Sequence, residues 1–370
     1  MFLHGENIGA VEQRLVDVGI ISAHALDKFI LPQHCSQCRS CRPKCNAKFA
    51  CAEPPEVSNF GKARWKHRSS RVGRGEMGTE ALDSTPPPRV SMVMPVHNGA
   101  RWLADAIASV LAQDFRDFEL ILVDDASRDA SPAIMAEAAA GDPRVTYLRL
   151  DKNLGLPAAL NHGFSVARGE MHSWTSDDNL LRPQMLSRLV ATLDAQPGAD
   201  IVHADFALID DAGVTLGVSR VGPVERLLYG NNIGACFLYR ARVTDALGGY
   251  DTGLFGVEDY DFWLRAAQRF TFVALHEDLY VYRKHGGSLT SQRSEQIQAL
   301  TAQIVERALP DTLPPRSRSE ILLGLALRSS RRWRLDLVRR AFRADPRPVL
   351  ARLPALARWS LVVARNRLAA

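Results

Sequence analysis

The chain has 370 residues, enough for one large domain with appendages or for two domains. An apolar fraction of 46% and a charged fraction of 24% are ordinary for a globular protein. No apolar run reaches the roughly 18 residues of a membrane-spanning helix, and residues 1–10 lack the pattern of a secretory signal. We therefore expect a cytoplasmic protein without a membrane span.

The net charge of +5 is unevenly distributed. Residues 311–370 contain 14 Arg, no Lys and 4 acidic residues, a net charge of +10, so the first 310 residues sum to −5. The basic character belongs mainly to the C-terminal segment, and it does not indicate binding to nucleic acid.

Five of the six cysteines lie between residues 35 and 51. Four of them follow the spacing C-x2-C-x2-C-x3-C, namely Cys35, Cys38, Cys41 and Cys45. This is the spacing of an iron–sulfur cluster loop, although Asn46 stands where a proline usually follows. Zinc is the alternative metal, with His34 or Cys51 as an additional ligand. The sixth, Cys236, is expected to be a buried solitary cysteine.

Residues 1–60 are interpreted as a small N-terminal segment that contains these cysteines. Residues 61–88, rich in Lys, Arg, Gly and Ser and closed by three prolines, predict a disordered linker. A third interpretation of the N-terminal region is that residues 1–76 do not belong to the natural protein, which would then begin at Met77. An ordered domain is predicted for residues 89–300 and a helical extension for residues 301–370.

An alternation of strands and helices begins at Arg89. Apolar runs predict strands at residues 90–95, 118–123, 145–150 and 171–174. Helical periodicity predicts helices around residues 102–111 and 157–168, the second ended by Gly169. This alternation predicts an α/β fold with a mostly parallel central sheet flanked by helices. In such folds, ligands bind beyond the carboxyl ends of the strands.

Three of the predicted strands end in groups that can bind a ligand. The stretches are Pro95-Val96-His97-Asn98, Asp124-Asp125-Ala126-Ser127 and Ser176-Asp177-Asp178-Asn179. An Asp pair is common turn chemistry, but parallel strands bring all three ends to one edge of the sheet. Adjacent carboxylates there suit Mg²⁺ or Mn²⁺ held against a diphosphate. The Leu-Leu-Arg-Pro that follows is interpreted as the entry to a helix opened by Pro183.

Residues 89–290 resemble the family-2 glycosyltransferases, which have the GT-A fold. The matching stretches, in order, are VSMVMPVHNG from Val90, IASVLAQ from Ile107, FELILVDDAS from Phe118, NLGLPAALNHG from Asn153, the Asp pair, and GVEDYDFWLR from Gly256. Six motifs in the expected order make the resemblance specific.

The resemblance implies a nucleotide-binding set and a metal site. The implied nucleotide-binding residues are Pro95, Val96, Asn98, Asp125, Asn153, Gly155, Leu156 and Asp177. Asp125 would accept a hydrogen bond from the imide of uracil, and its alternative role is to cap the next helix. Thymine offers the same imide, and GDP donors occur in the family. Asp178 would bind Mn²⁺ or Mg²⁺, with His285 as a further metal or phosphate ligand or an ordinary loop histidine.

The resemblance also implies a catalytic base. Asp259 would take the proton of the acceptor hydroxyl, Glu258 could share this role, and Asp261 is expected to cap the helix or face solvent. Transfer of this kind inverts the anomeric configuration. The processive members carry membrane spans and a Gln-x-x-Arg-Trp segment. Here Arg332-Trp333 lacks the Gln, which favours transfer of a single sugar.

The expected function is metal-dependent transfer of a sugar, with a UDP-sugar as donor and a glycan or a lipid-linked molecule as acceptor, in cell-surface polysaccharide biosynthesis. A sugar nucleotidyltransferase is one alternative, and a catalytically inactive nucleotide-binding protein with an N-terminal metal module is another. The tail from Ser319 to Leu368 predicts basic amphipathic helices broken at Asp345-Pro346 and at Pro354. Such helices either lie on an anionic membrane surface, making the protein a peripheral one, or pack back on the catalytic domain.

Overall fold

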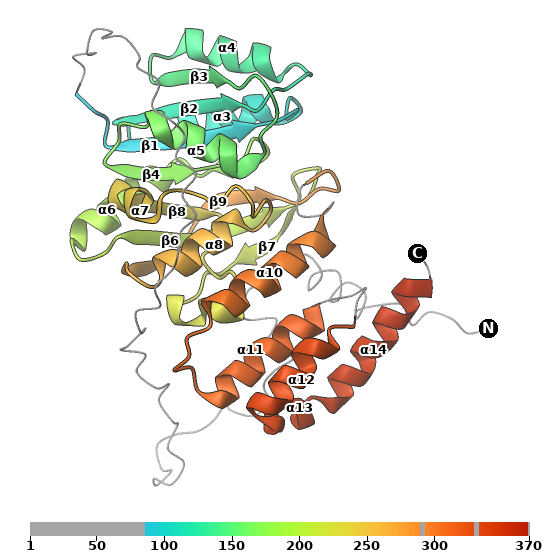
Figure 1. Ribbon diagram of the computed structural model, residues 1–370. Helices are drawn as coiled ribbons and strands as arrows, with labels where there is room; N and C mark the ends of the chain where they lie inside the picture. Colours follow the sequence, from blue (N-terminus) through green and yellow to red (C-terminus); the bar gives the residue numbers. More distant parts are fainter. Residues whose placement is uncertain (1–85, 289–292, 329–332, 369–370) are drawn as a thin grey trace, which may run out of the picture.

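The computed structural model describes residues 86–288, 293–328 and 333–368. One curled sheet with flanking helices is followed by a group of C-terminal helices (Figure 1). The predicted α/β class is therefore confirmed. The predicted linker up to residue 85 and the motif of Cys35, Cys38, Cys41 and Cys45 lie outside the described residues.

The elements of the sheet region alternate as the sequence predicts over the first half of the chain. The strands are β1 (Val90–Val96), β2 (Phe118–Asp124), β3 (Val145–Arg149), β4 (Met171–Trp174), β5 (Leu180–Leu181), β6 (Ile201–Ile209), β7 (Thr215–Ser219), β8 (Cys236–Arg240) and β9 (Phe272–Arg283). The helices are α3 (Leu103–Leu111), α4 (Ser131–Gly141), α5 (Leu156–Val166), α6 (Met185–Ala195), the 3-10 helix η1 (Val224–Tyr229), α7 (Ala241–Leu247) and α8 (Glu258–Ala266).

The strand order is β3-β2-β1-β4-β8-β6-β9-β5, with β7 added to β6. The pairs β2–β3, β1–β2, β1–β4 and β6–β9 are parallel. Antiparallel pairing of β8 with β4 and β6, and of β5 with β9, makes the second half of the sheet mixed. The first four strands therefore form the parallel unit that the alternation predicts.

β1 is the centre of this parallel unit, and all seven of its residues are buried. Helix α5 crosses it closely at Gly163, where an added Cβ would lie 2.5 Å from Cγ1 of Val93. At the start of the strand, Ser91 donates a 2.6 Å hydrogen bond to the buried carboxylate of Glu119 on β2. A satisfied polar pair of this kind fixes the register of neighbouring strands.

β5 is an element that the sequence analysis does not predict. Leu180 and Leu181 were expected to lead into a helix, but they pair antiparallel with Val281 and Tyr280 of β9. The helix α6 begins only at Met185. A strand of two residues is too short to show the alternation that identifies strands in a sequence.

The C-terminal helices are α10 (Ser294–Ala308), α11 (Pro315–Arg328), α12 (Leu335–Ala344), α13 (Pro346–Ala351) and α14 (Leu353–Leu368). The predicted breaks are present, because Asp345 caps α13 at Pro346 and Pro354 lies in the first turn of α14. Side chains of α10 to α13 share one hydrophobic core with Phe262 and Trp263 of α8. The extension thus packs on the sheet region, and α10 runs across the boundary predicted at residue 300.

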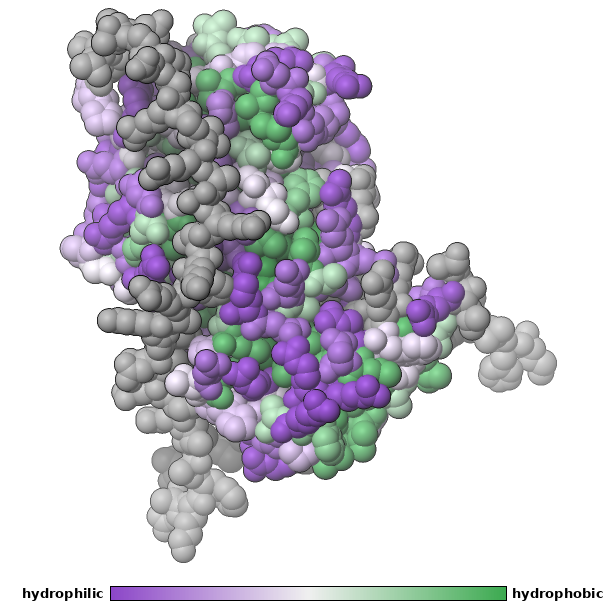
Figure 2. All heavy atoms as spheres, in the orientation of Figure 1, coloured by the Kyte–Doolittle hydropathy of each residue, from purple (hydrophilic) through white to green (hydrophobic). Residues whose placement is uncertain are grey.

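The outer side of the extension combines apolar and basic groups. The exposed apolar side chains there are Trp333, Leu335, Phe342, Leu350, Leu353 and Leu361. Apolar and strongly hydrophilic side chains lie next to each other over α11–α14 (Figure 2). Among the described residues, no helix is both long and apolar enough to cross a membrane.

Candidate active site

Three loops meet at the carboxyl edge of the parallel strands. In the β1–β2 register Val96 pairs with Asp124, and in the β1–β4 register Val93 pairs with Trp174. The loops that follow line a cleft of about 840 Å³. The residues predicted for the site that line this cleft are Pro95, Val96, Asn98, Asp125, Asn153, Gly155, Leu156, Asp177, Asp178, Glu258, Asp259 and His285. The structure therefore brings all of the described candidates together.

The loop after β1 is locked to the loop after β2. The backbone N–H of Asn98 donates to Oγ of Ser127, and its side-chain oxygen accepts from the N–H of Arg128. Asn98 and Ala126 both adopt left-handed backbone conformations, with φ of 56° and 57°. Asparagine tolerates this conformation, whereas it costs alanine roughly 1–2 kcal/mol. Strain of this kind persists where surrounding contacts hold a functional loop in place.

Asp125 is buried at the end of β2, and its carboxylate holds the loop before α5. Its two oxygens accept the backbone N–H groups of Leu154 and Gly155, at 2.6 and 2.8 Å. Gly155 has φ of 86°, a conformation that favours glycine. The described structure therefore shows Asp125 as the anchor of the Asn153–Leu156 loop, and it bonds to the start of α5 rather than to α4, the next helix. Each carboxylate oxygen has a second lone pair for a ligand.

The carboxylate of Asp177 packs against the backbone of Gly99. A Cβ at Gly99 would lie 1.7 Å from Oδ2 of Asp177, so only glycine leaves room for this arrangement. Burial, followed by the charge of Asp178, raises the pKa of Asp177 to about 7. Two carboxylates in one confined site repel each other unless a proton or a cation joins them.

Asp178 has one bonded and one free oxygen. Its Oδ2 lies 2.9 Å from Nε2 of His285, whereas its buried Oδ1 has no hydrogen-bond partner. The ring of His285 packs on Trp102 with ring centroids 4.4 Å apart. No group of three metal-ligating side chains is found among the described residues. Two protein donors are nevertheless adequate for Mg²⁺ or Mn²⁺, because substrate phosphates and water complete their coordination.

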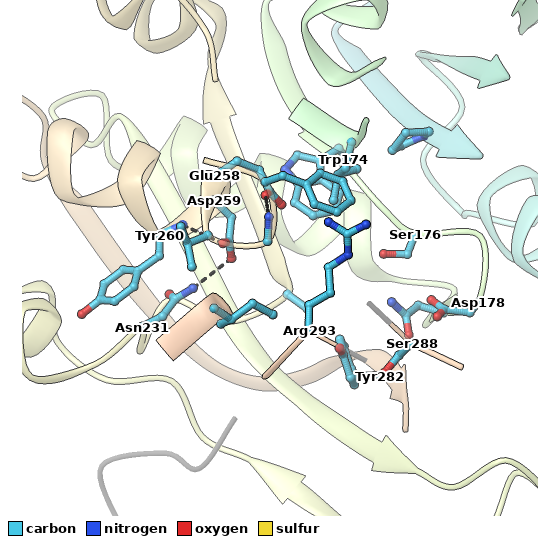
Figure 3. A pocket seen from close by; sticks show the side chains of 18 of the residues that line it. Trp174, Ser176, Asp178, Asn231, Glu258, Asp259, Tyr260, Tyr282, Ser288 and Arg293 are labelled. Carbon is cyan, nitrogen blue, oxygen red and sulfur yellow. Dashed lines mark hydrogen bonds between the residues drawn. The ribbon is translucent and has the colours of Figure 1, made fainter. Parts of the chain in front are cut away.

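Glu258 and Asp259 open helix α8 on another wall of the cleft (Figure 3). Oε2 of Glu258 accepts the N–H of Gly256 at 2.6 Å. Asp259 accepts the side-chain amide of Asn231 at 2.9 Å and the N–H of Tyr260 at 2.6 Å. Burial, with a contribution from Asp259, raises the pKa of Glu258 to about 8, and burial also raises the pKa of Asp259. A carboxylate with a raised pKa is a stronger base once it is ionised.

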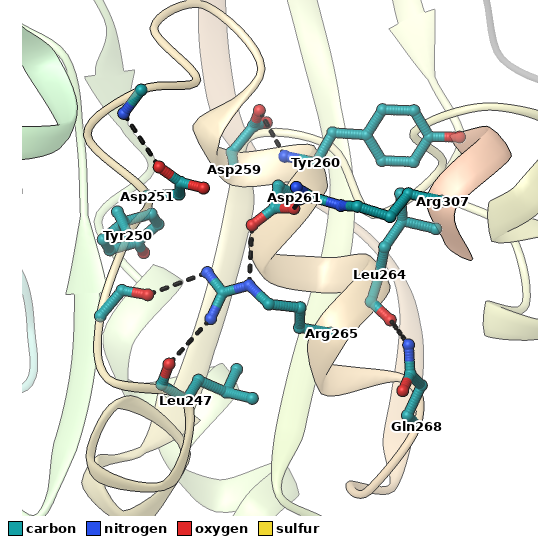
Figure 4. A network of polar contacts seen from close by, with 12 residues as sticks. Leu247, Tyr250, Asp251, Asp259, Tyr260, Asp261, Leu264, Arg265, Gln268 and Arg307 are labelled. Atoms are coloured by element: carbon teal, nitrogen blue, oxygen red, sulfur yellow. Dashed lines mark hydrogen bonds and ion pairs between the residues drawn. The ribbon is translucent and has the colours of Figure 1, made fainter. Parts of the chain in front are cut away.

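Asp261, which is expected to cap the helix or to face solvent, is instead buried in an ion-pair network. It is 2% exposed and forms ion pairs with Arg265 at 2.7 Å and with Arg307 of α10 at 2.6 Å (Figure 4). Arg265 also donates to the carbonyls of Leu247 and Gly249. Asp261 is therefore a buried anchor between α8 and the C-terminal extension. The i,i+4 spacing of Asp261 and Arg265 predicts their ion pair from the sequence. Arg307 is 46 residues away, and no sequence pattern predicts that contact.

Three cleft residues have no signal in the sequence that would identify them. Asn231 binds the carboxylate of Asp259 from the segment after η1. Arg293, at the start of α10, lies over the ring of Phe255, and its guanidinium points into the cleft (Figure 3). Arg328 reaches the cleft from the end of α11. Each depends on tertiary packing, and two of the three are arginines in an Arg-rich C-terminal region.

A catalytic GT-A fold is the class that this sheet and its carboxylate-lined cleft define. The sequence profile described as Glycosyl transferase family 2 matches residues 91–248. An uncharacterized glycosyltransferase of Rickettsia typhi is 30% identical over 228 residues, which are 58% of this chain and 70% of that protein. The chain belongs to glycosyltransferase family 2.

Other relatives are matched over a smaller share of their length. The matched region spans 31% of a Rickettsia felis glycosyltransferase, at 31% identity over 189 residues and 48% of this chain. The succinoglycan biosynthesis protein ExoO of Rhizobium meliloti is 35% identical over 151 residues, 41% of this chain and 42% of that protein. The chain thus spans about a third to two fifths of these two relatives.

Solved structures share the fold. TarS of S. aureus, in complex with UDP-GlcNAc, superposes with a TM-score of 0.53 at 20% identity over 74% of this chain and 79% of that one. The mannosyltransferase PcManGT of Pyrobaculum calidifontis, in complex with GDP-Man and Mn²⁺, gives a TM-score of 0.52 at 20% identity, over 77% of this chain and 82% of that one. The GT-A fold is thereby confirmed.

The raised pKa of Glu258 predicts how stability depends on pH. Between the ordinary pKa of 4.5 and about 8, the folded protein holds a proton that the unfolded chain has lost. The free energy of unfolding should therefore fall as pH rises through this window, by at most about 1.4 kcal/mol per pH unit for one group. Denaturant unfolding of Glu258→Gln between pH 5 and pH 8 should show a smaller fall than the wild type.

The exposed change Asp105→Asn on α3 serves as the control and should leave the pH dependence unchanged. Asp177 retains a contribution of its own in the Glu258 variant, because its pKa is raised to about 7. An identical pH profile in Glu258→Gln and wild type would contradict the assignment.

Proposed function

We propose that this protein transfers a single sugar from a nucleotide sugar, with UDP as the nucleotide, to a hydroxyl group of a glycan or lipid-linked acceptor in cell-surface polysaccharide biosynthesis. The observation that carries the proposal is one cleft with a free carboxylate oxygen on Asp178 and an acceptor-side carboxylate on Asp259. Two solved structures with the same fold hold the nucleotide sugars UDP-GlcNAc and GDP-Man, which supports a nucleotide sugar as donor. The similarity to ExoO, a succinoglycan biosynthesis protein, supports a role in polysaccharide biosynthesis.

The nucleotide would lie on the loops after β1 and β2. Pro95 and Val96 provide a floor for the base, and Asn98 borders it in a locked loop. Asp125 would accept from the base while it holds Asn153, Gly155 and Leu156 in place through the backbone. Asp177, confined against Gly99, would accept from the ribose hydroxyls.

The diphosphate would lie beside Asp178 and His285. Oδ1 of Asp178, which has no hydrogen-bond partner, would hold Mn²⁺ or Mg²⁺. Nε2 of His285 would join it as a ligand only by exchanging its 2.9 Å contact with Oδ2 of Asp178 for the cation. When bound, the cation supplies Lewis-acid stabilisation of the negative charge on the departing nucleoside diphosphate. Arg293 adds a guanidinium that points into the same cleft, a geometry suited to a phosphate oxygen.

Asp259 would act as the general base. Burial and the neighbouring charge of Asp259 raise the pKa of Glu258, so a proton shared by the pair would reside on Glu258 and leave Asp259 as the base. Asn231 orients the carboxylate through its 2.9 Å hydrogen bond. As Asp259 takes the proton of the acceptor hydroxyl, that oxygen attacks the anomeric carbon from the side opposite the diphosphate. The configuration at that carbon is therefore inverted.

The outer side of the extension supports association with an anionic membrane surface on the cytoplasmic side. Exposed arginines accompany the apolar side chains of α12–α14, among them Arg339, Arg343, Arg347, Arg358 and Arg365. Basic amphipathic helices bind membranes through the apolar area that they bury and through attraction to anionic headgroups. A lipid-linked acceptor would be reached from this position.

A donor screen tests the proposed reaction. Release of nucleoside diphosphate from UDP-sugars should exceed release from dTDP-sugars and GDP-mannose in the presence of Mn²⁺. Chelation with EDTA should abolish the release, added Mn²⁺ should restore it, and Asp178→Asn should prevent this rescue. The formation of a nucleotide sugar from a nucleoside triphosphate and a sugar phosphate would instead indicate a nucleotidyltransferase. No binding of any donor would contradict a nucleotide-sugar enzyme.

Removal of the proposed base gives a separate prediction. Asp259→Asn keeps the side-chain volume and should bind donor with the wild-type affinity. It should lose transfer by a factor of roughly 10²–10⁴, the usual contribution of a positioned base. Donor affinity is measured by calorimetry and turnover by diphosphate release, with Asp105→Asn as the matched control. Full turnover in Asp259→Asn would exclude this role.

The membrane proposal is tested by sedimentation with vesicles. Wild-type protein should bind phosphatidylglycerol vesicles more tightly than phosphatidylcholine vesicles, and added salt should weaken this binding. The double change Arg339→Gln and Arg343→Gln should weaken binding by roughly 30-fold, at about 1 kcal/mol per arginine. The control Arg116→Gln with Arg269→Gln changes the net charge equally elsewhere. Equal binding by both variants would argue against a membrane-facing extension.

A further inference from the structure

The wall of the cleft beside the proposed base is completed by the C-terminal extension. Gln298 and Thr301 of α10 and Leu325 and Arg328 of α11 all line the cleft. Arg328 is the last residue of α11, and it is the cationic group that this helix brings to the cleft. The motifs that carry the family resemblance end before this region, at Arg265.

Arg328 is a partly buried guanidinium without an acidic partner. It donates a hydrogen bond to the backbone carbonyl of Tyr229, and the phenol of Tyr260 is its other electrostatic neighbour. Within residues 86–288, 293–328 and 333–368, no carboxylate forms an ion pair with it. Burial, which removes water from around the charge, lowers the pKa of Arg328.

Several other partly buried arginines of this protein have carboxylate partners, and Arg240 and Arg283 each donate to two backbone carbonyls instead. Arg265 and Arg307 share the buried Asp261, at 2.7 and 2.6 Å. Arg144, also partly buried, pairs with Asp142 at 2.7 Å. A guanidinium has five N–H donors in a planar fork that fits a carboxylate or a phosphate. The fork of Arg328 has only one backbone acceptor, so an anion would complete it.

The position of Arg328 assigns it to the acceptor. Its Nη2 lies 3.1 Å from the place of a Cβ at Gly230, and the next residue, Asn231, binds the carboxylate of Asp259. Asn231 and Tyr260 lie on the opposite side of the cleft from Asp178 (Figure 3). The donor diphosphate belongs to the Asp178 side, and the group that faces Arg328 belongs to the molecule attacked through Asp259.

We propose that Arg328 binds an anionic group of the acceptor, a carboxylate or a phosphate on the sugar that carries the attacked hydroxyl or on its neighbour. This inference rests on the proposed function. A uronosyl carboxylate and a glycosyl phosphate present the same pair of oxygens to the guanidinium fork. The protein would therefore select acidic acceptors, and a neutral glycan would leave the buried cation without a partner.

Binding of small anions to the full-length protein tests this assignment. The probes are glucuronate and inorganic phosphate, with glucose as the neutral comparison, titrated calorimetrically in EDTA so that no cation draws phosphate to Asp178. Wild-type protein should bind both anions and should not bind glucose. Arg328→Gln should weaken anion binding by roughly tenfold or more, as expected for loss of a charge-assisted pair. Arg328→Lys should be intermediate, because it keeps the charge without the fork.

Arg316→Gln is the matched control, because Arg316 lies exposed on the same helix and pairs with Glu320. It should bind the anions as the wild type does. The ratio of the glucuronate and phosphate affinities of the wild type distinguishes a uronosyl from a phosphorylated acceptor. Equal anion binding by Arg328→Gln and wild type, or no anion binding by the wild type, would overturn the proposal.

Thermal unfolding separates a ligand-binding role from a structural one. A partly buried cation without an anionic partner lowers the stability of the free protein. Arg328→Met should therefore unfold at the wild-type temperature or above. Phosphate should no longer raise the unfolding temperature of this variant. A large fall in unfolding temperature together with unchanged protection by phosphate would assign Arg328 to structure alone. Donor hydrolysis by the wild type is measured separately. If the wild type hydrolyses no donor, the proposed function is wrong. The anion-binding measurement would still decide whether Arg328 binds an anion.

Discussion

Parallel pairing of β1 with β2 on one side and β4 on the other is the constraint on which the cleft depends. Each connection between these strands passes through a helix, so the three strands end at the same edge of the sheet. Because Val96 pairs with Asp124, β1 and β2 end at the same level, and the loops that follow them begin side by side. The loops after β1 and β4 are far apart in the sequence, but they thereby become neighbours in the cleft.

The cleft concentrates carboxylates in a place where water is scarce. Asp177, Glu258 and Asp259 all have pKa values raised by burial. Burying these groups costs folding free energy, which the surrounding strands and helices must offset. In the proposed function, a cation near Asp178 and a proton taken up by Asp259 would offset part of this cost. The left-handed backbone of Ala126 is also unfavourable, and it too is held in place by the packed residues around it.

The features that follow a short-range rule could be predicted from the sequence. The strand ends, the Asp pair and the acidic start of α8 each lie within a few residues of their motif, and all were brought to one cleft. Features that depend on partners far away in the sequence could not be predicted. The burial of Asp261 rests on Arg307, and the bonds of Asp125 to Gly155 need the folded loop. The two-residue strand β5 carries no periodic signal at all.

The two sides of the C-terminal extension differ in what they contact. Its inner side shares a hydrophobic core with α8 and supplies Arg328 to the cleft. Its outer side presents arginines and apolar groups to the surroundings. Because α11 packs directly on α12 and α13, docking of the outer side on a membrane would fix the orientation of the cleft relative to the lipid headgroups. A phosphate-bearing acceptor anchored in that membrane would then meet the guanidinium of Arg328 before its hydroxyl reached Asp259. In that geometry, one Arg-rich segment would provide both the attachment to the surface and the selection of the substrate.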